Sequence, residues 1–166
     1  MGNHDVCKKM TLQSNGDVWE FMLQTYNHLL KNIEINNFDK IIVPHNIGLG
    51  DVSTSGEVQK SFVKNPGAIQ LKEAEEQGGS NIKIERLDDI DLKEERIDFV
   101  KIDVEFFEPK TLAGMRETVK KYRPAVFIEV FKKNRKFVLD YFEGLGYEEP
   151  VKGFKLSNFL FLPKEK

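Results

Sequence analysis

The sequence predicts an α/β domain built on a mostly parallel sheet with helices on both faces. Segments of strand character alternate with segments of helical periodicity, which is the order that parallel sheets require. Residues 97–104 and 124–131 are nearly uninterrupted apolar runs, as expected for strands buried on both faces. The 166 residues suffice for one domain, residues 1–166, with a single core.

The N-terminal part of the chain predicts two strands around a helix. A short helix over residues 5–12 is followed by a turn at 13–17, because Asn-Gly is a strong chain breaker. The segment VWEFM at 18–22 predicts a strand. Residues 24–37 place apolar side chains at the spacing of one helical face. A second strand starts at Ile41 and runs toward Leu49, and Pro44 either makes it irregular or places it near a sheet edge.

The middle of the chain is more polar. Residues 48–56, GLGDVSTSG, predict a loop that has neither of the common phosphate-binding glycine spacings. Residues 57–80 predict a surface insertion with one short strand around 68–71. The alternating segment 81–87 predicts a half-exposed strand. The acids that follow it, Asp88, Asp89 and Asp91, predict a turn into a short helix, because they lack the glycine and closing glutamate of a calcium loop.

The C-terminal half repeats the strand–helix order. Pro109 suits the first turn of a helix that runs on to Pro124, because its missing N–H would be unpaired there. After the strand at 124–131, Asn134 is expected to cap a helix with Phe137, Val138, Tyr141 and Leu145 on its inner face. Residues 154–163 predict the last strand.

Two carboxylates, Asp103 and Glu105, stand at the end of the strand at 97–104. In open α/β sheets, ligands bind just beyond the carboxyl ends of the strands, so these acids mark a candidate site. The alternative is that they cap the next helix, since acidic side chains favour helix N-termini. The local pattern leaves both interpretations open.

Charge and composition argue against several partners. The net charge of −2 gives no broad attraction to nucleic acid or to an acidic membrane, and no apolar run is long enough to span a bilayer. The basic cluster Lys132, Lys133, Arg135 and Lys136 lacks the interleaved aromatic residues of a nucleic-acid face, which favours a solvated helix start over phosphate contacts. We therefore expect neither nucleic acid nor a membrane as a partner.

The histidines and the cysteine predict neither a metal site nor a disulfide. His4, His28 and His45 have no metal-ligand spacing. Cys7 is the single cysteine, which excludes an internal disulfide and fits a reducing compartment. The first ten residues also lack the apolar core of a secretory signal. We therefore expect a cytoplasmic protein without a bound metal.

The segment IDFVKIDVEFFEPKTLAGMRETVKKYRPAVFIEV resembles the second half of FkbM-type methyltransferases. Their strand reads K-I-D-V-E-G-x-E, and it precedes a helix with L-x-G-x, then R-P and a strand ending in I-E. The matching residues here are Lys101, Ile102, Asp103, Val104, Glu105, Glu108, Leu112, Gly114, Arg123, Pro124 and Glu129. Further segments resemble the family in the same order, namely Gly2–His4, Gln24–Asn37, His45–Asp51 and Arg86–Ile90. The resemblance runs from residue 2 to about residue 163.

The resemblance implies a Rossmann-like methyltransferase sheet, mostly parallel with an antiparallel C-terminal strand. It also implies S-adenosylmethionine as cofactor and O-methylation of a small-molecule or glycan hydroxyl. Asp103 and Glu105 would lie near the methyl donor and acceptor, where a carboxylate can orient or deprotonate the hydroxyl. The implied cofactor-binding residues are Gly2, Asn3, Glu20, Asn46 and Asp51. A turn-forming role for Asp51 and a surface role for Glu129 remain alternatives.

The chain departs from the family pattern at three places. The family's first strand and most of its glycine-rich loop have no counterpart, so the expected sheet is incomplete at the N-terminus, either in a fragment of a longer protein or in a domain that closes differently. Glu20 stands earlier than the family's ribose-binding acid. Phe106 replaces a glycine and is expected to crowd the substrate end. An inactive remnant that serves as a binding or oligomerisation module is therefore the alternative function, and an exposed sheet edge would favour a homo-oligomer.

Overall fold

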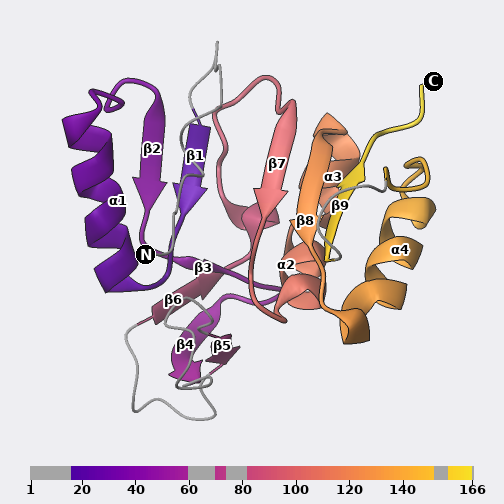
Figure 1. Cartoon of the computed structure of the whole chain (residues 1–166), viewed down its shortest axis with the longest axis horizontal. Helices are drawn as coiled ribbons and strands as arrows, with labels where there is room; N and C mark the ends of the chain where they lie inside the picture. Colours follow the sequence, from indigo (N-terminus) through magenta and orange to yellow (C-terminus); the bar gives the residue numbers. More distant parts are fainter. Residues whose placement is uncertain (1–15, 60–69, 74–81, 152–156, 166) are drawn as a thin grey trace.

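The computed structural model describes residues 16–59, 70–73, 82–151 and 157–165 (Figure 1). The predicted helix at 5–12, the predicted cofactor residues Gly2 and Asn3, and most of the insertion predicted at 57–80 lie outside these ranges. No helix within the described residues is long and apolar enough to cross a membrane.

The first strands form a parallel pair. Strand β1 (Gly16–Trp19) pairs with β2 (Ile42–His45), and helix α1 (Leu23–Ile35) connects them and packs on β2. The predicted strand at 18–22 starts and ends earlier, because the Gly16 N–H already donates to the Ile41 carbonyl, 2.7 Å away. Pro44 lies in β2, which pairs only with β1 among the described strands.

A second sheet contains both apolar runs. Strand β7 (Phe99–Ile102) is parallel to β8 (Ala125–Glu129), and β9 (Asn158–Phe161) is antiparallel to β8, as expected for the last strand. Helix α4 (Arg135–Gly144) lies beside β9 in Figure 1. The arrows of β1, β2, β7 and β8 point the same way, so their carboxyl ends face one side of the molecule (Figure 1).

The part of the chain between β2 and β7 forms a third sheet. Its strand order is β3 (Gly48–Leu49), β6 (Ile82–Glu85), β4 (Thr54–Gln59) and β5 (Gln70–Glu73). The prediction of a loop over 48–56 was wrong at both ends, because β3 and β4 pair with β6, in parallel and antiparallel register respectively, and only residues 50–53 form a loop. These polar residues become strands through pairing with a distant partner, and strand preference depends strongly on such context.

The predicted long helix after β7 consists of two helices, α2 (Glu108–Gly114) and α3 (Arg116–Tyr122). They are separated at Met115, which has φ −120°. The carboxylate of Asp88, on the short 3-10 helix Leu87–Asp89, accepts hydrogen bonds from the backbone N–H groups of Glu117 (3.1 Å) and Thr118 (2.8 Å). A side chain distant in sequence thus accepts hydrogen bonds from the otherwise unpaired backbone N–H groups in the first turn of α3, and this stabilises a new helix start.

The main hydrophobic core lies between the β7–β8–β9 sheet and its helices. Val126 and Ile128 of β8 are fully buried, whereas Phe99 of β7 is 41% exposed. The prediction that β7 is buried on both faces was therefore wrong. Side chains alternate between the faces of a strand, and only the face that carries Ile102 meets the core. On α4, Phe137 is 44% exposed instead of inward, and the fully buried ring is that of Phe142.

Candidate functional site

The turn that follows β7 has an unusual backbone. Glu105 and Phe106 have φ values of 37° and 73°, which place two consecutive non-glycine residues in the left-handed region. Each such residue costs roughly 1–2 kcal/mol relative to the right-handed conformation. The turn redirects the chain from β7 into α2, which begins at Glu108 with Pro109 in its first turn, as predicted. Strained turns of this kind cluster at functional sites.

Carboxylates gather around this turn. Burial raises the pKa of Glu105 above its ordinary value, and the negative charges of Asp103, Glu129 and Glu108 raise it further. The structure therefore brings the two predicted acids together with two more from α2 and β8. Asp103 also forms an ion pair with Lys101 at 3.0 Å. A carboxyl group with a raised pKa is suited to accept a proton from a substrate at neutral pH.

Glu108 fixes the loop after β8, a role that the sequence did not suggest. Its side chain is fully buried, and its carboxylate accepts hydrogen bonds from the Phe131 N–H (3.2 Å) and the Asn134 side-chain amide. That amide also donates to the Phe106 carbonyl at 3.2 Å. Asn134 occupies the N-cap position of α4, as predicted, but its side chain makes no capping hydrogen bond there. Its amide instead connects the two loops of the site.

Glu129 ends β8 on the same side of the sheet. It is half-buried and accepts a hydrogen bond from the Ser157 hydroxyl at 2.9 Å. Its negative charge contributes to the raised pKa of Glu105, and the surface role remains the alternative.

Asp51 follows β3 in a loop that packs closely against α2. A Cβ atom on Gly114 would lie 1.7 Å from the Gly50 carbonyl oxygen, so only glycine allows this approach. The Thr111 hydroxyl donates to the Leu49 carbonyl at 3.0 Å. The Oδ1 atom of Asp51 is buried and has no hydrogen-bond partner among the described residues, and the Lys110 ammonium lies 3.8 Å away. This oxygen is therefore an acceptor to which a ligand N–H or O–H group can donate.

Glu20 and Asn46 lie together, but both have structural contacts. The Glu20 carboxylate accepts the Met22 N–H at 2.8 Å and so supports the start of α1. The Asn46 amide donates to the carbonyls of Glu20 (2.7 Å) and Phe21 (3.3 Å). These bonds join the carboxyl ends of β1 and β2, and the predicted cofactor contacts of the two residues stay predictions.

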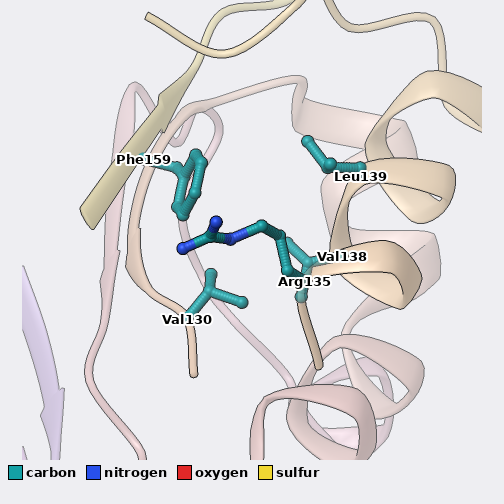
Figure 2. Close-up of a pocket in the computed structure, with 5 residues that line it drawn as sticks. All are labelled: Val130, Arg135, Val138, Leu139 and Phe159. Atoms are coloured by element: carbon teal, nitrogen blue, oxygen red, sulfur yellow. The ribbon is translucent and has the colours of Figure 1, made fainter. Parts of the chain in front are cut away.

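The depression drawn in Figure 2 is separate from these acids. It is a shallow depression between β8, β9 and α4 that encloses almost no space, and it is lined by Val130, Arg135, Val138, Leu139 and Phe159. The guanidinium group of Arg135 lies 5.2 Å from the centre of the Phe159 ring. Pockets for ligands of drug size measure roughly 300–1,000 Å³, so this depression is too small for a nucleoside cofactor. Within the described residues, no group of His, Cys, Asp or Glu is arranged to hold a metal ion.

An α/β protein that gathers polar groups beyond the ends of parallel strands has the arrangement in which α/β enzymes hold their ligands. The family comparison makes the class specific: the FkbM methyltransferase domain matches residues 4–149. The chain belongs to the FkbM methyltransferase family.

A solved structure supports the same fold. The crystal structure of an FkbM methyltransferase from Methylobacillus flagellatus superposes with a TM-score of 0.59 at 18% sequence identity. The match covers 89% of this chain but 36% of that protein, so this chain spans about a third of its relative. No curated protein matches the sequence.

Proposed function

We propose that the protein is an S-adenosylmethionine-dependent methyltransferase that O-methylates a small-molecule or glycan hydroxyl. The observation that carries the proposal is the raised pKa of Glu105 at the end of β7, in a member of a methyltransferase family. O-Methylation requires a hydroxyl oxygen to lose its proton as it attacks. A carboxylate with raised proton affinity is a better base for this purpose than an ordinary glutamate.

In this proposal Glu105 accepts the acceptor proton, while Asp103 and Glu129 keep the surroundings negative. When bound, S-adenosylmethionine supplies an electrophilic methyl group on a positively charged sulfur. The acids suit such a cation electrostatically. The Oδ1 atom of Asp51 accepts no hydrogen bond within the described residues, so it suits an N–H or O–H group of the adenosine part. Most of the rate gain would come from holding the hydroxyl in line with the methyl group.

Glu105→Gln tests the proposed base. The variant should lose about 10²- to 10⁴-fold in methyl transfer, the usual contribution of general-base catalysis, while binding of S-adenosylhomocysteine changes little. The measurements are S-adenosylhomocysteine release and calorimetry. The matched control is Glu143→Gln, which makes the same change on the exposed face of α4. Unchanged turnover in Glu105→Gln would remove Glu105 as the base, and absence of any cofactor binding at millimolar concentration would argue against an active enzyme.

One observation favours the non-catalytic alternative. Among the described strands, β1 pairs only with β2 and β7 pairs only with β8, so each has an edge without a ladder partner. Open edges promote association with another chain, which is the basis for proposing a binding or oligomerisation module. Light scattering during size-exclusion chromatography tests self-association. A monomer at all concentrations would count against the oligomer, and turnover that depends on Glu105 would exclude a purely structural role.

A further inference from the structure

The turn between β7 and α2 has a backbone conformation that its residues do not favour. The Phe107 N–H donates to the Val104 carbonyl at 2.9 Å, which closes a four-residue turn around Glu105 and Phe106. Both central residues have positive φ, 37° and 73°, as in a type I′ turn, which glycine, asparagine and aspartate favour. A glutamate and a phenylalanine keep this conformation only where the surrounding structure holds them in it. Contacts from outside the turn therefore decide its geometry.

The side-chain amide of Asn134 contacts this turn from the loop after β8. Its nitrogen donates to the Phe106 carbonyl at 3.2 Å, and the same nitrogen donates to the Glu108 carboxylate. Both partners are acceptors, so the amide directs its nitrogen at them, and its two N–H groups serve one acceptor each. The hydrogen bond that closes the turn uses the carbonyl of Val104 and not that of Phe106. The two bonds of the amide, the Asn134 clamp, therefore fix a peptide group that the turn itself does not engage.

The buried carboxylate of Glu108 anchors this clamp. It is fully buried and also accepts the Phe131 N–H at 3.2 Å, so its position is fixed from the same loop. The Phe131 ring stacks on the Phe106 ring with centroids 3.7 Å apart. The stacked ring restrains the side chain of Phe106, whereas the Asn134 amide restrains its carbonyl. The backbone of the turn is therefore oriented by the clamp.

We propose that Asn134 is a positioning residue for Glu105, because the clamp holds the turn in its left-handed conformation. That conformation keeps the Glu105 carboxylate partly buried and near the charges of Asp103 and Glu129. Without the clamp, the turn relaxes toward the right-handed conformations that its residues prefer, and the carboxylate moves further into water. Burial is the largest cause of the raised pKa of Glu105, so this pKa then falls toward its ordinary value. The consequence for methyl transfer rests on the proposed function, whereas the effect on the carboxylate does not.

Asn134 also occupies the N-cap position of α4, so the test has to separate a clamp from a helix cap. Asn134→Ser keeps a residue that caps helices well, but its single O–H cannot serve two acceptors. Carbon-13 NMR of the carboxyl groups measures the pKa of Glu105 in the protein without added ligand, and Glu105→Gln identifies the signal. We expect a lower pKa of Glu105 in Asn134→Ser than in the wild type. The matched control is Asn36→Ser, which removes an amide bond to the Asn32 carbonyl at the end of α1 and should leave this pKa unchanged.

Asn134→Asp is a second variant of nearly the same shape, and its stability is measured by urea unfolding. A helix cap predicts that the serine and aspartate variants both stay near the wild type, because these residues cap about as well as asparagine. The clamp predicts a lower unfolding midpoint for both, and the lowest for aspartate. Its carboxylate has no proton to donate, and it meets the Glu108 carboxylate and the Phe106 carbonyl.

An unchanged pKa of Glu105 in Asn134→Ser, or an Asn134→Asp protein as stable as the wild type, would overturn the proposal. The proposed function fails separately: if Glu105→Gln leaves methyl transfer unchanged while the Asn134 variants behave as expected, the clamp stands and Glu105 is not the base. If both stand, Asn134→Ser should lower kcat and shift the acidic limb of the pH–rate profile to lower pH, with little change in S-adenosylhomocysteine affinity.

Discussion

Replacing Glu108 with leucine should destabilise the protein by about 2–4 kcal/mol. The carboxylate is fully buried and accepts hydrogen bonds from the Phe131 N–H and the Asn134 amide. Leucine leaves the Phe131 N–H and one N–H of the Asn134 amide unpaired, while the amide keeps its bond to the Phe106 carbonyl. Each unpaired buried N–H costs about 1–3 kcal/mol. Part of this loss is offset, because the variant no longer has to remove a carboxylate from water.

Glu108→Gln should cost less, about 1–2 kcal/mol. The amide oxygen can still accept from the Phe131 N–H, so one of the two bonds survives. Its NH₂ group, however, meets the NH₂ group of Asn134. The Asn134 side chain can rotate to offer its oxygen, but it then loses its bond to the Phe106 carbonyl. The order of stability should therefore be wild type, glutamine variant, leucine variant.

Urea unfolding followed by far-UV circular dichroism measures these differences. Glu143→Leu on the exposed face of α4 is the control and should stay within about 0.5 kcal/mol of the wild type. Amide exchange of Phe131 provides a local measurement, because its N–H should exchange faster in both Glu108 variants. A Glu108→Leu protein as stable as the wild type, with unchanged exchange at Phe131, would refute the role of this carboxylate.

Two further predictions concern charge and packing. Folding raises the pKa of Glu105 above its ordinary value of 4.5. Between the pKa of the unfolded state and that of the folded state, the folded protein holds a proton that the unfolded chain lacks, so the free energy of unfolding falls as pH rises through that window. Glu105→Gln should thus raise the melting temperature relative to wild type more at pH 8 than at pH 4; equal shifts would contradict this. Gly114→Ala forces a Cβ against the Gly50 carbonyl and should cost about 1–3 kcal/mol in urea unfolding; an unchanged midpoint would disprove the close approach.

The sequence predicted the elements whose own residues decide their conformation. The predicted apolar strand that ends at Asp103 and Glu105 is β7. Helix α1 was predicted from the helical spacing of its apolar residues. The raised pKa of Glu105 was not predictable, because it depends on burial and on Glu129 and Glu108, which folding brings near. The position of the acids thus follows from the local pattern, whereas their chemistry follows from the fold.

Three of the errors share one cause, which is a partner distant in sequence. The residues of β4 are polar and lack a strand pattern, yet they pair with β6. The break between α2 and α3 depends on Asp88, which lies 29 residues before Glu117. Asn134 has the residue type and position of a helix cap, but a buried carboxylate on α2 competes for its amide. Local propensity describes only the neighbouring residues, so it cannot include these contacts.

One network accounts for both unusual properties of the turn after β7. The buried carboxylate of Glu108 holds Asn134, and Asn134 holds the carbonyl of Phe106 while Phe131 holds its ring. These contacts offset the cost of the left-handed conformation at Phe106 and at Glu105 before it. The same conformation keeps the Glu105 carboxylate in a partly buried place among other acids, which raises its pKa. Glu108 would therefore act on the proposed chemistry as a positioning residue, through the backbone and not through contact with a substrate.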